Sequence, residues 1–157
     1  MLNSNSYFNE MGKVVDEWTK EYSELNKRLQ ACNNKNGWHS RERRELSEEM
    51  EVLKNKNPFT RGESIAYAAW KNSVTDGALE FEVSDCICED DIYGFLKTLR
   101  KARIESFVLT YADDNIMEII YILVEEGCTI TGPALMKYSG ENRKKMEVFG
   151  IRFLVNE

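Results

Sequence analysis

The order of hydrophobic periodicities in the C-terminal half of the chain is the feature that most limits its fold. Between residues 79 and 128, apolar residues first alternate with glutamates, as in a half-buried strand, and then recur every three or four positions, as in a helix. A second strand and a second helix follow, and Gly127 supplies the residue type that most readily closes a helix. This order predicts parallel strands, because each helix would be the crossover between two strands.

Two further strands are expected after Gly127. Residues 128–131 have strand-like composition, and Gly132 and Pro133 then interrupt a pattern that resumes over residues 134–138. Proline is tolerated at bulges and sheet edges, so we expect an irregular strand there. Residues 146–155 predict a last strand, antiparallel to its predecessor. The expected order is βαβαββ, with both helices on one face of a mixed four-stranded sheet in a two-layer α+β domain.

The N-terminal half predicts an antiparallel helical hairpin. Apolar residues spaced by three and four mark one face of a long first helix; they are Phe8, Met11, Val15, Trp18, Tyr22, Leu25, Leu29 and Cys32. Ser40 is a suitable N-cap for a second helix that ends before Pro58. The connection between the two helices is short, which favours antiparallel packing.

The two helices of this hairpin differ in length. At 1.5 Å per residue the first spans about 37 Å and the second about 24 Å, so the second covers the first only as far as about Trp18. Phe8, Met11 and Val15 must then be buried by a third helix, by the sheet or by a second copy of the chain. Trp18 and Tyr22 are bulky for a regular two-stranded zipper, so intramolecular packing is favoured over a homodimer through the N-terminal helix.

A third helix is expected to bridge the two parts. Thr60 and Glu63 have the spacing of a capping box, in which each side chain satisfies a backbone donor near the other residue. Asp76 and Gly77 then turn the chain into the first strand. We therefore expect residues 1–78 to form the hairpin and bridging helix and residues 79–157 to form the sheet domain, with the two packed as one unit.

Charge and hydropathy argue against several kinds of partner. The net charge is −6, and residues 79–157 carry the whole imbalance, with 9 Lys+Arg against 15 Asp+Glu. Such a domain repels a phosphate backbone on average, which makes nucleic acid an unfavoured partner. No apolar stretch approaches the length of about 18 residues that a membrane span requires, and the N-terminus lacks the pattern of a secretory signal. We expect a cytoplasmic protein.

The four cysteines do not suggest a disulfide framework or a zinc site. A chain of this length can build a sufficient core, and Cys86 and Cys88 form a CxC motif without a second pair. With a single histidine in the chain, a metal or redox role is the minor interpretation. We interpret all four, including Cys32 and Cys128, as small core hydrophobes.

Acidic residues follow both of the first two strands. Asp85 lies after the first strand and Asp113 and Asp114 after the second, where open α/β sheets place their ligands. Facing carboxylates there could bind Mg²⁺, which is the one cofactor alternative; otherwise we expect none. The favoured interpretation is that these residues cap helices, because carboxylates interact well with helix N-termini.

The tip of the hairpin is the expected partner-binding surface. It combines an aromatic, the only imidazole and several cations, and tryptophan and arginine are enriched at binding hot spots; the residues are Trp38, His39, Arg41, Arg43 and Arg44. Phe8 and Met11 are a second expected contact. In the alternative, Trp38 folds back onto the second helix and the arginines pair with glutamates on that helix.

These observations predict a non-enzymatic protein-binding module whose hairpin occupies a partner surface, as a regulator or inhibitor of the sort encoded on mobile elements. A metal-dependent enzyme or ligand binder at Asp85, Asp113 and Asp114 is one alternative. The order βαβαββ is similar to that of the C-terminal domain of bacterial translation initiation factor three, and this similarity implies RNA binding as the other alternative.

Overall fold

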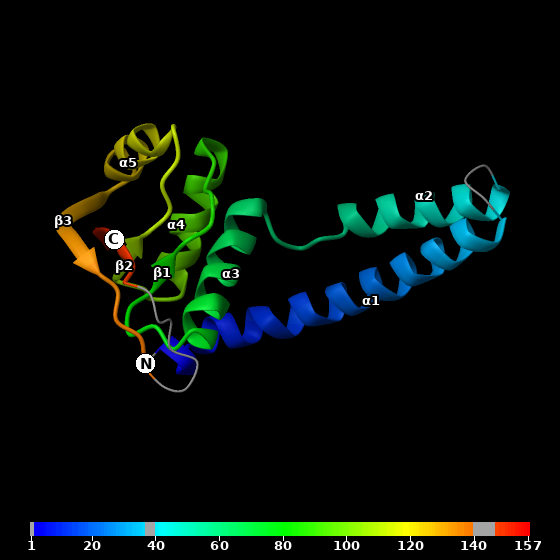
Figure 1. Cartoon of the computed structure of the whole chain (residues 1–157), viewed down its shortest axis with the longest axis horizontal. Coiled ribbons are helices and arrows are strands. Elements are labelled where there is room, and N and C mark those ends of the chain that lie inside the picture. The colour runs from blue at the N-terminus through cyan, green and yellow to red at the C-terminus, as the bar shows by residue number, and fades with distance from the viewer. Residues whose placement is uncertain (1, 37–39, 140–146) are drawn as a thin grey trace. The chain divides into compact units, whose positions relative to one another are not determined.

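The computed structural model describes residues 2–36, 40–139 and 147–157 (Figure 1). Over these residues the chain has five α-helices and a mixed four-stranded sheet, which confirms the predicted α+β class. Its contacts form two compact units, one of Met1–Asn9 with Phe59–Glu157 and the other of Glu10–Pro58. We call them the sheet unit and the hairpin unit. The third helix belongs to the sheet unit, whereas the sequence analysis grouped it with the hairpin.

The elements in chain order are η1 (Leu2–Ser4), α1 (Ser6–Asn36), α2 (Arg41–Asn55), α3 (Arg61–Thr75), β1 (Glu82–Val83), η2 (Glu89–Asp91), α4 (Ile92–Lys101), β2 (Ser106–Leu109), α5 (Ile116–Glu125), β3 (Cys128–Leu135) and β4 (Phe149–Val155). The two η elements are short 3₁₀ helices. Among the helices of the described residues, none is both long enough and apolar enough to cross a membrane.

The strands lie in the order β1-β2-β4-β3. β1 and β2 are parallel, as the crossover rule predicts, and β4 is inserted between β2 and β3 and is antiparallel to both. The pairing of β3 with β4 shifts between Ile130 and Gly132, so the predicted irregularity before Pro133 is confirmed. β1 is shorter than expected, and Leu79 is 59% exposed.

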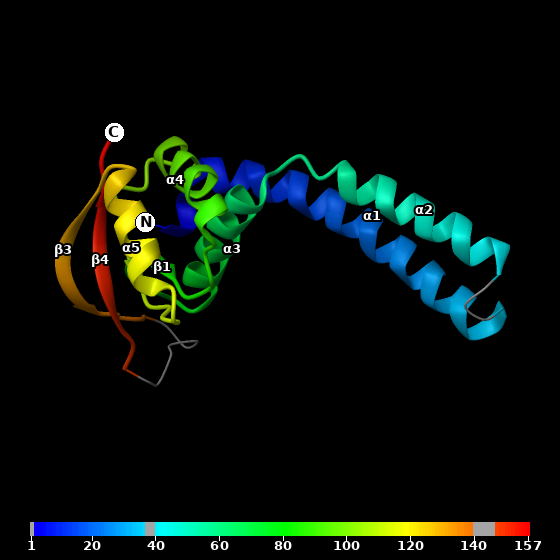
Figure 2. The same ribbon diagram turned by 90° about the horizontal axis from the view of Figure 1, so that it is seen from above.

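Helices α4 and α5 lie on the same side of the sheet (Figure 2). The core beneath them is aromatic. Phe107 of β2 meets Phe95 of α4 edge to face, with ring centroids 5.5 Å apart, and stacks on Phe153 of β4 at 5.2 Å. All three side chains are fully buried, so each contributes about 1.5–3 kcal/mol of hydrophobic stabilisation to the folded state.

The first apolar residue of α1 is part of the core of the sheet unit. Phe8 is fully buried and stacks on Trp70 of α3 at 5.2 Å, with Phe81 at 6.1 Å. Trp70 Nε1 also donates a hydrogen bond of 2.7 Å to the carbonyl oxygen of Leu2. The third helix and the sheet therefore bury Phe8. These are two of the three ways of burying it that were expected from the sequence. Met11 is only 5% exposed, so neither side chain is available to a partner.

The hairpin unit follows the predicted pattern. Ser40 caps α2 by accepting a hydrogen bond from the backbone N–H of Arg43. Its core consists of residues of the α1 stripe and of α2, namely Tyr22, Leu25, Leu29, Cys32, Leu46, Met50 and Leu53. Trp18 Nε1 donates a 3.0 Å hydrogen bond to the carbonyl oxygen of Leu53 in the last turn of α2. The second helix thus reaches as far back along α1 as its length predicted.

α3 and α4 cross at two glycines. The predicted capping box of Thr60 and Glu63 starts α3. A Cβ atom on Gly62, in the first turn, would overlap the carbonyl oxygen of Asp91 and lie 2.8 Å from the backbone nitrogen of Phe95. A Cβ atom on Gly94 would lie 2.9 Å from the Thr60 side chain, while the nearest backbone atoms, at 3.6 Å and beyond, are at ordinary contact distance. The close approach of the two helices therefore depends on Gly62 above all.

We expect Gly62→Ala to lower the free energy of unfolding by about 1–3 kcal/mol, because its Cβ meets backbone atoms that cannot rotate away. Gly94→Ala is the matched comparison and should cost less, because the atom it meets belongs to a side chain and alanine favours the helix. Urea unfolding followed by circular dichroism measures both. A Gly62→Ala protein as stable as wild type would contradict this account of the crossing.

The other face of the sheet is partly covered by residues 136–139, which continue the chain beyond β3. Leu79 N donates to the carbonyl oxygen of Lys137, and a small cluster forms around Val108, Ala134 and Met136. Glu82 was expected on a solvated face, but it is only 4% exposed. The alternation of polar and apolar residues could not reveal this cover, because the covering segment is more than 50 residues away in the chain.

Two hydroxyl groups satisfy the buried Glu82 carboxyl. Thr110 Oγ1 lies 2.9 Å from Glu82 Oε1, and Tyr138 OH lies 2.7 Å from Glu82 Oε2. The hydroxyl of Tyr138 comes from the covering segment. A buried carboxyl is tolerated when its oxygens are hydrogen-bonded, so this contact both satisfies Glu82 and attaches the segment to the sheet.

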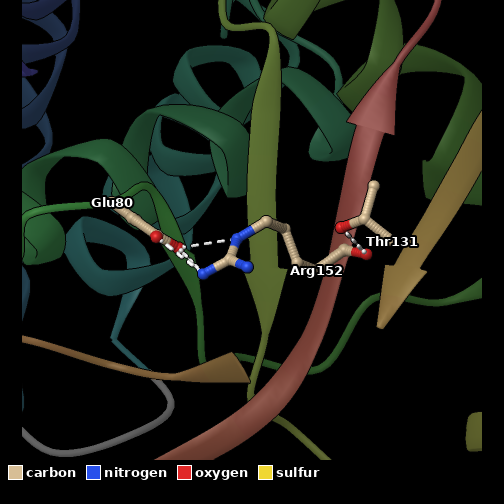
Figure 3. A network of polar contacts seen from close by, with 3 residues as sticks. All are labelled: Glu80, Thr131 and Arg152. Atoms are coloured by element: carbon tan, nitrogen blue, oxygen red, sulfur yellow. Dashed lines mark hydrogen bonds and ion pairs between the residues drawn. The ribbon is translucent and has the colours of Figure 1, made fainter. Parts of the chain in front are cut away.

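An ion pair on the same face joins β4 to the residues that precede β1. Arg152 extends across β2 and makes a forked contact with Glu80, with nitrogen–oxygen distances of 2.7–3.1 Å (Figure 3). The backbone carbonyl of Arg152 also accepts a hydrogen bond from Thr131 Oγ1. Both charged side chains are about a third or more exposed, so the pair contributes at most about 1 kcal/mol.

We expect Tyr138→Phe to lower the free energy of unfolding by about 1–3 kcal/mol, because a buried carboxyl oxygen loses a donor. The change removes one oxygen and leaves the ring in place. Thermal unfolding measures the loss, and Tyr121→Phe, at a 65% exposed tyrosine, is the control. Equal stability of the two variants would show that the Tyr138 hydroxyl does not hold the covering segment.

Candidate functional site

The carboxyl ends of β1 and β2 lie side by side because the strands are parallel neighbours. Two of the acidic residues there, Asp91 and Asp113, accept hydrogen bonds from nearby backbone N–H groups. Asp113 accepts a 2.9 Å hydrogen bond from Asn115 N and a short one from the Tyr111 hydroxyl. Asp91, buried at the start of α4, accepts one from Cys88 N. Asp85 and Asp114 are exposed.

The described residues contain no group of three or more histidine, cysteine, aspartate or glutamate side chains placed to hold a metal ion. The candidate magnesium ligands Asp85, Asp113 and Asp114 therefore do not form such a group. Asp113 already binds Tyr111 and a backbone amide. Of the acidic residues at this end of the sheet, Asp91 and Asp113 therefore have local structural roles near the starts of α4 and α5.

Tyr111 connects the loops after β1 and β2. Its hydrogen bond to Asp113, followed by a contact with the Cys86 side chain, raises the pKa of the Tyr111 phenol above its usual value.

Cys86 and Cys88 are exposed, which corrects their interpretation as core hydrophobes. Ile87 between them is 2% exposed and anchors the loop, so its two neighbours face solvent. The Arg61 guanidinium reaches Cys88, with Nη2 3.6 Å from the sulfur and Nε 3.5 Å from the buried Asp91 carboxylate. In extended chain, a buried middle residue of a CxC motif places the two cysteines on the opposite, exposed side. This alternation was a signal in the sequence that could have predicted their exposure.

The other two cysteines, Cys32 and Cys128, are buried, as predicted. Burial raises the pKa of the Cys128 thiol to about 11, with a smaller opposing effect from Arg100. The raised pKa keeps Cys128 protonated at neutral pH. The stability that this protonated thiol contributes is present at neutral pH and is lost as the pH rises through about 11.

We expect iodoacetamide to alkylate only Cys86 and Cys88 in the native protein at neutral pH. Cys32 and Cys128 should react only after unfolding, because burial blocks both and the Cys128 thiol is protonated. Mass spectrometry of tryptic peptides identifies each labelled site. Native labelling of Cys128 as fast as that of Cys86 would contradict the structure.

The predicted hairpin tip is only partly visible. Trp38 and His39 lie outside the described residues, so their exposure stays a prediction. Arg41 is exposed, and its Nε lies 2.9 Å from Glu45 Oε1. Arg43 is half-buried and Arg44 is exposed. Of the expected pairing between arginines and glutamates on this helix, the Arg41–Glu45 contact is present.

The hairpin unit carries a groove that was not predicted from the sequence. It lies between α1 and α2 and has a volume of about 700 Å³. Its lining is apolar at the floor and charged at the rim; the residues are Glu21, Glu24, Leu25, Arg28, Glu45, Glu48, Glu49, Val52, Leu53 and Lys56. The rim residues recur at intervals of three and four on each helix, which places them on one helical face. This spacing was the sequence signal for a charged rim.

The groove is acidic. Five glutamates and two cations line it, a net charge of −3. The one ion pair across it, Arg28 with Glu49, is 3.9 Å long and more than half exposed on both sides, so it contributes little. Val52, 54% exposed, offers apolar surface. The groove thus combines an apolar floor with a negative rim.

The chain was compared with known proteins. No curated protein and no solved structure matched it. Residues 65–155, more than half of the chain, matched a family model, and this match spans the sheet from β1 to β4 and most of α3. The hairpin unit lies outside the matched residues. The chain belongs to the family described as "Domain of unknown function (DUF7698)".

Proposed function

We propose that this chain is a non-enzymatic protein-binding module, working in the cytoplasm as a regulator or inhibitor, and that its hairpin binds a basic amphipathic helix of another protein. The acidic groove between α1 and α2 is the observation that carries this proposal. Its mechanism is occupancy: the partner helix is covered while it lies in the groove. The exposed thiols of Cys86 and Cys88 are consistent with a reducing compartment.

The shape of the groove favours a helix as its occupant. Two antiparallel helices leave between them a furrow into which the side chains of a third helix can pack. Leu25 and Leu53 form the floor, and Val52 stands on one wall. An amphipathic helix with apolar residues at every third and fourth position would bury these side chains along one face.

The charge of the groove favours a basic partner. Lysine or arginine on the flanks of the bound helix would face glutamates on both walls, namely Glu21 and Glu24 on α1 and Glu45 and Glu48 on α2. Complementary charge of this kind increases the association rate and fixes the register. A second copy of the same groove would instead oppose like charges, which argues against a homodimer formed groove to groove.

The proposal predicts that a short leucine-and-lysine amphipathic helical peptide binds the full-length protein, and that the same peptide with glutamate in place of lysine does not. Fluorescence anisotropy measures the affinity. Val52→Asp should weaken binding by about tenfold or more, because it places a charge where apolar surface must be buried. Glu24→Lys with Glu48→Lys should weaken it through repulsion, and added salt should weaken wild-type binding.

Matched controls lie on the same unit outside the groove. Val14 is 43% exposed, close to the exposure of Val52, and Glu17 is exposed on α1. Val14→Asp and Glu17→Lys should bind the lysine peptide as wild type does. Equal binding of the two peptides, or equal loss in Val14→Asp and Val52→Asp, would refute the groove as the binding surface. If sedimentation instead showed a dimer whose formation the peptide inhibits, the occupant of the groove would be a second copy of the chain.

A further inference from the structure

The loop between β1 and η2 carries two thiols that share one exposed face. Cys86 and Cys88 are both exposed and free, and Ile87 between them is buried. Side chains two residues apart in extended chain point to the same side, and the backbone of Cys88 is extended, with φ −86° and ψ 159°. The two sulfur atoms therefore lie on one surface of the loop.

Each thiol has a polar neighbour of a different kind. Arg61 Nη2 donates to Cys88 Sγ, and the guanidinium is held in place by the buried Asp91 carboxylate. Cys86 contacts the Tyr111 hydroxyl, which is itself bound to Asp113. A cation thus stands at one sulfur, and a neutral hydroxyl group stands at the other.

The geometry points to Cys86 and Cys88 as a peroxide-oxidisable dithiol, in which Cys88 reacts first and Cys86 then closes a disulfide with it. Nothing in the family description assigns such a site. The inference is independent of the proposed hairpin function, because both thiols lie in the sheet unit, within the residues that match the family.

The Cys88 thiolate attacks one oxygen of hydrogen peroxide, an S–O bond forms, the O–O bond breaks, and the leaving hydroxide takes up the proton that Cys88 lost, giving water and a sulfenic acid. Cys86 sulfur then attacks the Cys88 sulfur, an S–S bond forms, the S–O bond breaks, and the hydroxide leaves as water with the Cys86 proton. Two thiols and one peroxide give one disulfide and two waters.

Arg61 is placed to assist the first step. Its guanidinium has several N–H donors beside the Cys88 sulfur, and one of them can donate to the peroxide oxygen that leaves, where negative charge develops. Arg61 is a catalytic residue in this scheme, because it contacts both the reacting sulfur and the departing oxygen. Neither buried cysteine has comparable access to solvent.

The spacing permits the second step after a small movement. Two residues of extended chain separate the Cα atoms by about 6.6 Å. Disulfides are found at Cα separations of about 4.4–6.8 Å, so the pair begins near the upper end of that range. Closing the bond would draw Cys88 away from Arg61, and the oxidised loop would therefore differ from the reduced one.

The surrounding charge selects the oxidant. Asp85, Glu89 and Asp90 are exposed carboxylates beside the two thiols. They repel anionic oxidants such as oxidised glutathione, whereas neutral hydrogen peroxide is not repelled. The chemical class that this site would take is therefore a small uncharged hydroperoxide.

The test uses the full-length reduced protein treated with hydrogen peroxide, then alkylated and digested with trypsin. Residues 72–97 form one tryptic peptide that carries Cys86 and Cys88 and no other cysteine. We expect this peptide to become about 2 Da lighter and resistant to alkylation, and dithiothreitol to reverse the change. Oxidised glutathione should produce it more slowly. Cys86→Ser should accumulate a sulfenic acid at Cys88 that dimedone traps.

The role of Arg61 is tested by Arg61→Gln, with Arg41→Gln in the hairpin unit as the matched control. Oxidation should slow several-fold in the first variant and stay at the wild-type rate in the second, with far-UV circular dichroism confirming that both are folded. The proposal is overturned if the peptide stays reduced, or if only disulfides between molecules form. Dimedone labelling of Cys86 in Cys88→Ser as fast as that of Cys88 in Cys86→Ser would overturn the order of the two steps.

Discussion

The structure depends on one apolar face of α1 serving two cores. Phe8, at the start of the helix, stacks on Trp70 in the sheet unit, while Leu25 and Cys32 belong to the core of the hairpin unit. Burial of these side chains is the main free energy available to either core. Among the described residues of the hairpin unit, the groove beside this face adds the exposed apolar surface of Val52 to a negatively charged rim.

Local patterns predicted most of the fold, and long-range contacts account for what they missed. The capping box at Thr60, the bulge before Pro133 and the strand–helix order depend on residues close in the chain, so the sequence contained them. The burial of Glu82 depends on Tyr138, which is 56 residues away. The Gly62 crossing likewise depends on where α4 lies, and no local pattern reports that position.

The candidate sites were harder to predict than the fold, for the same reason. Burial excludes Phe8 and Met11 from any surface role, although their residue types suited one. The groove depends on which sides of α1 and α2 face each other, and helical periodicity alone leaves that choice open. The alternation around Ile87 indicated that Cys86 and Cys88 are exposed. The general preference of cysteine for buried positions led to the opposite prediction.

The acidic groove of the hairpin is proposed to bind a basic helix. Hydrogen–deuterium exchange with and without the lysine peptide tests it most directly, because it locates the bound surface without any mutation. The account predicts added protection of backbone amides in residues 21–28 and 45–56 and no change in the sheet unit. Protection confined to the sheet unit, or none at saturating peptide, would contradict it.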